Sequence, residues 1–241
     1  MFYDHNITVV IPAYNEADTI ADVVRDFHSV DCVDRVIVVD NNCKDATAEL
    51  AREAGAEVIA ESAAGYGCAL RAGMNHAVEL GADILILTEA DGSFRGMDLW
   101  KLAYYLLDAN MVLGTRTTKQ MVVQGANMDA MLRWGNVAMA KLLEMFWLLP
   151  HEPRLTDVGC TYRAIWADSW KQMRAGTTEA GPSFSPEMIC EGYRQGMRTI
   201  EIPVHYGARM GGSSQHSDSF QKVCKTAWGM FKTILRKRFR G

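Results

Sequence analysis

Two carboxylates stand directly after an apolar run of the sequence, in the order Glu89-Ala90-Asp91-Gly92 after residues 83–87. Carboxylates two residues apart on an extended chain can hold a hard divalent cation, such as Mg²⁺ or Mn²⁺, through their oxygens. A cation held in this way would neutralise a diphosphate group that binds or leaves. A solvated turn with an Asp-Gly pair accounts for these residues equally well when they are considered alone.

Two further groups of polar residues also follow apolar runs, and both suit a nucleotide. Tyr14 and Glu16 follow the run 7–11, where an aromatic ring can stack on a base and polar groups can bond its edge. Asp40 and Asn41 follow the run 35–39, where an acidic side chain can accept hydrogen bonds from ribose hydroxyls. Taken singly, the first group is also explained by a capped strand-to-helix turn and the second by an Asx turn.

These residues need a scaffold, and the first 92 residues predict one by alternating apolar runs with helical segments. The apolar runs predict strands at 7–11, 35–39, 56–59 and 83–87. The segments between them predict helices at 15–30, 45–55 and 66–80. Strands that are apolar on both faces are typical of a mostly parallel sheet covered by helices, which predicts an α/β fold. The polar groups then share the sheet edge at which open α/β folds bind ligands.

The alternation stops after residue 115. The remaining sequence predicts, in order, a helix at 126–149, a helix at 186–195, a strand at 200–204 and a Gly/Ser-rich loop at 207–219. Neither an internal repeat nor a clear linker between domains is evident. The sequence therefore predicts one main α/β unit.

The composition is that of an ordinary globular chain. Apolar residues make up 49% of the 241 residues and charged residues 22%, which excludes a disordered or collagen-like protein. No apolar run reaches about 18 residues, so no membrane span is expected, and the first residues lack the features of a signal peptide. Six scattered cysteines indicate reduced thiols and predict a cytoplasmic protein without a zinc site.

The net charge of -4 divides between two unlike parts of the chain. Residues 220–241 contain seven Lys and Arg and no Asp or Glu, so the other 219 residues have a balance of -11. On a helical wheel, residues 220–241 place aromatic and aliphatic side chains on one half and six of the seven cations on the other. Such a helix is typical of one that lies on an anionic membrane surface. The alternative is a helix packed on the acidic body, and no motif indicates nucleic acid as a partner.

Four blocks of the sequence, in this order, resemble family 2 glycosyltransferases with the GT-A fold. They are VVIPAYNE at 9–16, VVDN at 38–41, GYGCALRAG at 65–73 and EADG at 89–92. Three later blocks are similar to the polyprenyl-phosphate sugar synthases of that family. They are VLGTR at 112–116, LTDVGCTYR at 155–163 and IPVHYGARMGGSS at 202–214. The sequence departs from the family pattern at Glu89, where Asp is usual, and at Tyr66, where Lys is common.

The resemblance implies a GT-A domain over residues 1–219, with a Rossmann-like, mostly parallel mixed sheet, followed by a basic amphipathic helix over 220–241. It implies an inverting, divalent-metal-dependent enzyme that moves a hexose from a nucleoside diphosphate sugar to a polyprenyl phosphate. With the basic helix, it also implies a peripheral protein on the cytoplasmic face of a membrane. Two alternatives stay open: a family 2 transferase with a soluble or glycolipid hydroxyl acceptor, and a nucleotide-sugar-binding protein that has lost turnover. The sugar and the base stay open as well.

The resemblance also implies roles for individual residues. Glu89 and Asp91 would bind the metal. The residues implied to bind the nucleotide sugar are Pro12, Ala13, Tyr14, Glu16, Asp40, Asn41, Gly67, Arg71 and Ala90. Those implied to act in catalysis are Asp91, Asp157, Arg116, Arg133 and Arg209, the arginines because their planar fork suits phosphate. Those implied to bind the acceptor are Arg133, Arg163, Glu187, Ser213 and Ser214.

Two of these assignments have structural alternatives. Asp157 would be the general base if the acceptor is a hydroxyl, but it could equally be a cap with Arg163 as its internal ion-pair partner. Glu187 could act at the site or simply be an acidic residue at the start of a helix.

Overall fold

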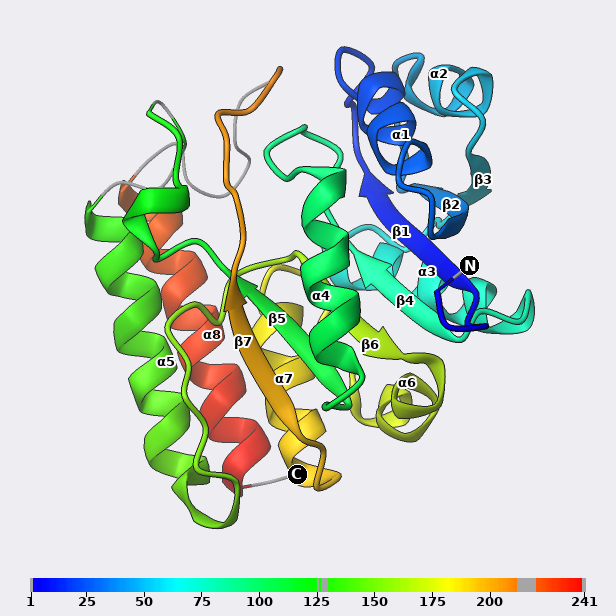
Figure 1. The fold of residues 1–241 in the computed structure, drawn as a ribbon. Coiled ribbons are helices and arrows are strands. Elements are labelled where there is room, and N and C mark those ends of the chain that lie inside the picture. Colours follow the sequence, from blue (N-terminus) through cyan, green and yellow to red (C-terminus); the bar gives the residue numbers. More distant parts are fainter. Residues whose placement is uncertain (1, 125, 127–129, 212–219, 240–241) are drawn as a thin grey trace.

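A seven-stranded mixed sheet with helices on both faces forms the centre of the protein (Figure 1). The structure is a computed structural model and describes residues 2–124, 126, 130–211 and 220–239. The strands are β1 (Ile7–Ala13), β2 (Val33–Asp40), β3 (Glu57–Ala60), β4 (Ile84–Leu87), β5 (Met111–Thr115), β6 (Arg163–Trp166) and β7 (Thr199–Pro203). The α-helices are α1 (Ile20–His28), α2 (Thr47–Glu53), α3 (Tyr66–Glu79), α4 (Leu99–Leu106), α5 (Ala130–His151), α6 (Ala167–Met173), α7 (Phe184–Arg194) and α8 (Phe220–Phe239).

The strand order brings the polar segments of the sequence to one edge of the sheet. The order is β3-β2-β1-β4-β6-β5-β7, and β6 runs antiparallel to its neighbours β4 and β5, whereas the other pairs are parallel. Strands β1, β2, β4, β5 and β7 therefore all end at the same edge, and β6 begins there. Ala13 at the end of β1 lies opposite Asp40 at the end of β2. The predicted α/β fold with a mostly parallel mixed sheet is confirmed.

Both faces of the sheet are buried, because the strands carry apolar side chains on both sides. Val9 and Ile11 of β1 pack with α1 and α4 on one face, whereas Val10 packs with α3 and α7 on the other. The sequence predicted these central strands closely. It placed the start of the first helix at residue 15, but α1 begins at Ile20 because residues 16–19 form turns.

Helices α5 and α8 lie side by side next to the β7 edge of the sheet (Figure 1). Helix α8 packs on α5 and α7, and it buries Thr233, Ile234 and Lys237. The helix predicted for the basic segment is therefore present, but its faces differ from the helical wheel. Lys237, placed on the cationic half, is only 7% exposed, whereas Trp228 of the apolar half is 56% exposed. In the residues that the structure describes, no helix is both long and apolar enough to cross a bilayer.

Candidate functional site

Asp91 lies just beyond the end of β4, in a buried turn. Its Oδ1 accepts hydrogen bonds from the backbone N–H and the hydroxyl of Ser93, at 2.9 and 2.6 Å. Its Oδ2 lies 3.0 Å from Nε of Arg209, yet neither of these buried atoms makes a hydrogen bond with a described residue. One oxygen of Asp91 is thus fixed by the turn, and the other is paired with Arg209 by charge but makes no hydrogen bond to a described residue.

Two further carboxyls, Glu16 and Glu89, lie close to Asp91. Burial raises the pKa of Glu89 to about 7, and repulsion from Asp91 contributes to this shift. Burial raises the pKa of Glu16 to about 7 as well, again with a contribution from Asp91. The hydroxyl of Thr161 donates a 2.8 Å hydrogen bond to Oε1 of Glu89 and orients it. Carboxyls that are costly to ionise together are stabilised by a nearby cation.

These observations fit a hard divalent cation such as Mg²⁺ or Mn²⁺. Asp91 Oδ2 is a buried carboxylate oxygen without a hydrogen bond, and Glu89 stands two residues before it. Within the described residues, no cluster of three or more His, Cys, Asp and Glu side chains is arranged to hold a metal. The remaining ligands of a cation at Asp91 would therefore be phosphate or water oxygens, as is common for Mg²⁺.

A cavity of about 280 Å³ lies at this edge of the sheet, and we call it the donor cavity after the ligand that the sequence predicts for its residues. It runs from the ends of β1 and β2 to the turn after β4. Its lining residues are Pro12, Ala13, Tyr14, Glu16, Asn41, Ala64, Gly65, Tyr66, Ala69, Glu89, Ala90, Asp91, Gly181, Pro182 and Arg209. The three polar groups that the sequence placed at one edge are therefore brought together.

Asp40 and Asn41 act in the structure mainly through the loops that they hold. Asp40 Oδ1 accepts a 2.8 Å hydrogen bond from the backbone N–H of Cys43, and Asp40 is not among the residues that line the cavity. Asn41 lines the cavity, but its side-chain amide is committed to the loop 61–65. It donates to the carbonyls of Glu61 and Ala63 and accepts from the N–H of Gly65. Asn41 thus shapes the cavity through this loop.

Gly67 and Arg71 hold a neighbouring loop and do not line the donor cavity. The backbone N–H of Gly67 donates to the carbonyl of Ala180 at 2.7 Å, and a Cβ on Gly67 would lie 2.2 Å from the carbonyl oxygen of Glu179. Arg71 Nη1 donates to the same Glu179 carbonyl at 2.6 Å. The polar groups of these two residues dock residues 179–180 against α3, and their contact with the nucleotide sugar stays a prediction.

A second cavity, of about 210 Å³, adjoins the first, and we call it the acceptor cavity because it lies beside residues for which the sequence predicts a role at the acceptor. Tyr66, Glu89, Pro182 and Arg209 line both cavities and form their shared wall. Near this wall Arg116 and Tyr206 line the acceptor cavity. Its other end, between α5 and α8, is mostly apolar and is formed by Met131, Leu132, Gly135, Asn136, Met139, Val223, Thr226, Ala227 and Met230.

Arg116 and Asp157 form a buried ion pair beside the acceptor cavity. Nε and Nη2 of Arg116 donate to the two oxygens of Asp157 at 2.8 and 3.0 Å, and the N–H of Gly159 also donates to this carboxylate. The Arg116 guanidinium and these hydrogen bonds outweigh burial and lower the pKa of Asp157. Asp157 is buried and both of its oxygens accept hydrogen bonds from the protein, whereas its role as a general base stays a prediction. Its ion-pair partner is Arg116, whereas the sequence suggested Arg163.

Arg163 and Glu187 are both inside the protein. The guanidinium of Arg163 donates to the backbone carbonyls of Val158, Cys160 and Ser185, and the residue is 1% exposed. Glu187 is fully buried, and its Oε2 accepts hydrogen bonds from the N–H groups of Thr178 and Glu179. Both side chains are buried and hold loops of the protein, and their role in acceptor binding stays a prediction.

Three predicted site residues remain: one lies beside the acceptor cavity and two lie outside the described residues. Arg133 lies on α5 and is partly exposed. Its neighbours Leu132 and Asn136 line the acceptor cavity, and Arg133 is not part of that lining. Ser213 and Ser214 lie outside the residues that the structure describes.

Tyr206, Thr161 and the residues of α5 and α8 that line the acceptor cavity were not predicted to belong to the site. Tyr206 lies under the Arg116 guanidinium, with 5.3 Å between the Arg116 Cζ and the ring centroid, and Thr161 orients Glu89. Both stand within the blocks that resemble the polyprenyl-phosphate sugar synthases, and this position could have indicated them. The side chains of α5 carry no comparable signal, because methionine and leucine at helical spacing are equally typical of an ordinary core.

Proteins with assigned activities resemble this chain along most of its length. Glycosyltransferase AglJ of Haloferax volcanii is 29% identical to this chain over 213 residues. The match covers 88% of this chain and 66% of AglJ, so this chain spans just under two thirds of the length of AglJ. Undecaprenyl-phosphate mannosyltransferase of Micrococcus luteus is 27% identical over 235 residues, covering 93% of this chain and 94% of that protein. Dolichyl-phosphate hexose transferase of Haloferax volcanii is 28% identical over 241 residues, covering 98% and 96%.

Solved structures share the fold. Glucosyl-3-phosphoglycerate synthase from Mycobacterium tuberculosis, in complex with Mn²⁺, UDP and glucosyl-3-phosphoglycerate, superposes with a TM-score of 0.73 at 18% identity. The match covers 98% of this chain and 80% of that one. The complex of the same enzyme with phosphoglyceric acid has a TM-score of 0.74 at 19% identity. These matches confirm the GT-A fold expected from the sequence.

The family model of glycosyl transferase family 2 matches residues 8–168. That range contains β1, except for its first residue, and β2 to β6, together with the carboxylates at 89 and 91, the Arg116–Asp157 pair and most of the residues that line the donor cavity. The chain therefore belongs to glycosyl transferase family 2.

Proposed function

We propose that this glycosyltransferase moves a hexose from a nucleoside diphosphate sugar to a polyprenyl phosphate at a membrane surface. The shared wall of the two cavities carries the proposal, because the sugar and the acceptor oxygen must meet where the cavities adjoin. Glu89 and Arg209 stand at that point. Support also comes from the relatives named for undecaprenyl-phosphate mannose transfer and dolichyl-phosphate hexose transfer.

In the donor cavity, the base would lie beside Tyr14 and the diphosphate beside Asp91 and Arg209. Asp91, with Glu89, would hold Mg²⁺ or Mn²⁺, and a bound cation neutralises the charge that develops on the leaving diphosphate. Arg209 adds a positive charge near the same position, which can stabilise the charge that develops on the diphosphate in the transition state. Attack from the acceptor cavity, on the side opposite to the leaving group, would invert the anomeric carbon.

The acceptor cavity suits an amphiphile that carries a phosphate. Nε and Nη2 of Arg116 are used by Asp157, which leaves Nη1 without a hydrogen bond to a described residue. Together with Arg209 it offers two guanidinium groups to a phosphate at the polar end, whereas Met131, Met139 and Met230 offer apolar surface to a chain. Among the described residues that line the cavity, Glu89 is the one carboxyl and there is no histidine. A phosphate acceptor needs no general base, because its oxygen is already anionic.

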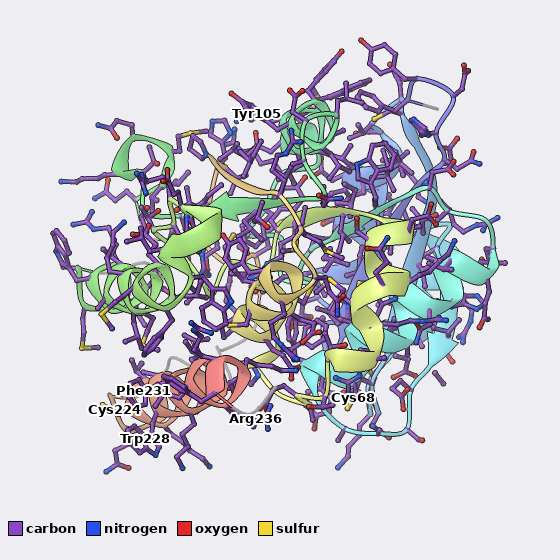
Figure 2. All side chains as sticks on the ribbon, turned by 90° about the horizontal axis from the view of Figure 1, so that it is seen from below. Cys68, Tyr105, Cys224, Trp228, Phe231 and Arg236 are labelled. Carbon is purple, nitrogen blue, oxygen red and sulfur yellow. The ribbon has the colours of Figure 1, made fainter. Side chains whose placement is uncertain are left out.

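The surface outside this cavity suits contact with a membrane. Trp228 of α8 and Trp134 of α5 are 56% and 65% exposed. Figure 2 shows Trp228 and Cys224 on the outer side of α8, away from the sheet. The Lys232 ammonium lies 5.2 Å from the centroid of the Trp228 indole. Aromatic and cationic side chains in this arrangement favour the interface of an anionic bilayer, so we place the protein peripherally on the cytoplasmic face of a membrane.

The experiment that tests this function uses the purified chain, Mn²⁺ or Mg²⁺, and a panel of UDP- and GDP-hexoses. Undecaprenyl phosphate and dolichyl phosphate are offered in vesicles, and transfer of labelled sugar to lipid is measured by chromatography. The proposal expects a mild-acid-labile glycolipid with one of these phosphates.

The matched control offers the corresponding free alcohols, undecaprenol and dolichol, which have the same chain but no phosphate. Equal transfer to phosphate and alcohol would contradict the assignment of the acceptor and favour the hydroxyl-acceptor alternative. Binding of a nucleotide sugar without transfer or hydrolysis would instead favour a protein that has lost turnover.

A further inference from the structure

Arg209 is brought to Asp91 by the backbone of the segment 207–211. The N–H of Gly207 donates to the carbonyl of Ser93 at 2.8 Å, and the N–H of Met210 donates to the carbonyl of Asp91 at 2.9 Å. These two bonds fix the segment against the turn 91–93 on both sides of Arg209. The position of the Arg209 backbone therefore does not depend on the contact that its side chain makes.

The contact between Arg209 and Asp91 differs from the other arginine–carboxylate pair at this sheet edge. Arg116 binds Asp157 through two nitrogens in hydrogen-bonding geometry. Arg209 approaches Asp91 through Nε at 3.0 Å, but both atoms are buried and neither makes a hydrogen bond to a described residue. A buried charge is normally both paired and hydrogen-bonded. The Arg209 guanidinium thus neutralises Asp91 without being fixed to it.

We propose that Arg209 is an exchangeable counter-ion of Asp91, which it neutralises until a divalent cation arrives with the nucleotide. The cation then takes Oδ2 of Asp91, and the Arg209 side chain turns to the phosphates of the nucleotide while its backbone stays in place. This inference rests on the proposed role of Asp91 as the cation ligand and adds a second role for Arg209.

The exchange makes cation and nucleotide binding cooperative. A cation that binds alone must displace Arg209 from Asp91 and leave a partly buried guanidinium without an anion. A cation that binds with a diphosphate gives Arg209 a new anionic partner, to which it can donate several hydrogen bonds. Each ligand therefore raises the affinity for the other by the same factor.

The test measures Mn²⁺ binding directly, from the electron paramagnetic resonance signal of free Mn²⁺, with and without saturating UDP or GDP. It compares the wild type with Arg209→Met and Arg209→Lys. Without nucleotide, we expect Arg209→Met to bind Mn²⁺ at least about fivefold more tightly than the wild type, a factor within the usual range of coupling between sites. With nucleotide, we expect Arg209→Met to bind Mn²⁺ more weakly than the wild type. Arg209→Lys should retain part of the cooperativity because it keeps the charge.

Arg198→Met is the matched control, because Arg198 precedes β7 at the opposite end of that strand and bonds the carbonyl of Asp108. It removes the same charge and should leave both Mn²⁺ affinities unchanged. If thermal unfolding shows that Arg209→Met is not folded, Arg209→Gln takes its place. Equal changes with and without nucleotide, or no change, would overturn the exchange and make Arg209 a fixed partner of Asp91. Failure of the wild type to bind Mn²⁺ with either nucleotide would overturn the proposed metal and donor site as well.

Discussion

The two cavities that meet at Glu89 are built in different ways. The donor cavity lies at the ends of parallel strands, and the carboxyl groups that line it stand in the short turns that follow β1 and β4. The acceptor cavity lies mainly between two helices, α5 and α8, and takes its polar end from the loops that precede β6 and follow β5 and β7. In the first cavity the sheet fixes the positions of the polar groups, whereas in the second they depend on buried ion pairs between distant loops.

The difference bears on what a charged residue near each cavity does. Near the donor cavity, Asp91 keeps a carboxylate oxygen without a hydrogen bond. Near the acceptor cavity, the polar side-chain atoms of Asp157, Arg163 and Glu187 make hydrogen bonds to other groups of the protein. The acceptor side therefore offers few charges to a ligand and much apolar surface. This balance fits a lipid that needs only its phosphate recognised.

The largest expected effect tests the donor side of the comparison. Asp91→Asn removes the charge that would hold the cation but keeps the hydrogen bonds to Ser93. We expect transfer to fall by at least about 10³-fold, because a bound cation contributes several kcal/mol to the transition state. The measurement is the initial rate of sugar transfer at saturating Mn²⁺. The control is Asp31→Asn, which changes an exposed residue at the opposite edge of the sheet and should keep the wild-type rate. If Asp91→Asn is as active as the wild type, then Asp91 does not bind the metal.

The second prediction tests whether Asp157 belongs to the scaffold of the acceptor side. Asp157→Asn leaves Arg116 buried and without its carboxylate, so the free energy of unfolding should fall by about 3–5 kcal/mol. Urea unfolding followed by circular dichroism measures this change. Asp168→Asn breaks the exposed pair with Lys171 and should cost less than about 1 kcal/mol. If Asp157→Asn is as stable as the wild type but inactive, then Asp157 acts in the reaction itself.

The third prediction concerns the outer surface of the acceptor side. Trp228→Ala should weaken binding to phosphatidylglycerol-containing vesicles by about tenfold, because burial of one large apolar side chain contributes about 1.5–3 kcal/mol. Co-sedimentation with vesicles measures the affinity. Tyr105→Ala is the control, because Tyr105 is 50% exposed on α4, on the opposite side of the molecule (Figure 2). Equal losses in both variants would show that membrane contact is not confined to the α5–α8 side.

The smallest expected effect is a dependence of stability on pH. The pKa values of Glu16 and Glu89 rise from 4.5 to about 7 on folding, so between these values the folded protein binds more protons than the unfolded chain. The free energy of unfolding should therefore fall as the pH rises from about 4.5 to 7. We expect the melting temperature to drop across this window by about 2–4 °C for each kcal/mol lost.

The comparison for this prediction is Glu89→Gln, which should show a smaller drop, measured by thermal unfolding without ligands. Folding lowers the pKa of other groups, such as Asp157 and Asp98. These groups change the stability at more acidic pH and so do not hide the change expected between pH 4.5 and 7. A flat profile in the wild type would mean that the two glutamates ionise normally in the fold.

The sequence predicted the donor side far better than the acceptor side, for a physical reason. Buried strands leave a periodic apolar signal, and residues just after them must lie at the sheet edge, so Tyr14, Glu16 and Asp91 could be placed from the chain alone. The partner of Asp157 is 41 positions away in the sequence, and no periodicity reports such a contact. Gly67 and Arg71 stand in a block that resembles the family, yet their polar groups are taken by residues 179–180.

Helix α8 carries two kinds of positive charge, which should respond differently to salt. Lys237 is buried and pairs with Glu187 and Glu191, whereas Lys225 and Lys232 are exposed near Trp228. Concentrated salt shortens the screening length to about 3 Å at 1 M and weakens exposed charges much more than buried ones. If the protein binds membranes as proposed, a salt wash should therefore release it still folded, with α8 packed on α7 and the acceptor cavity intact.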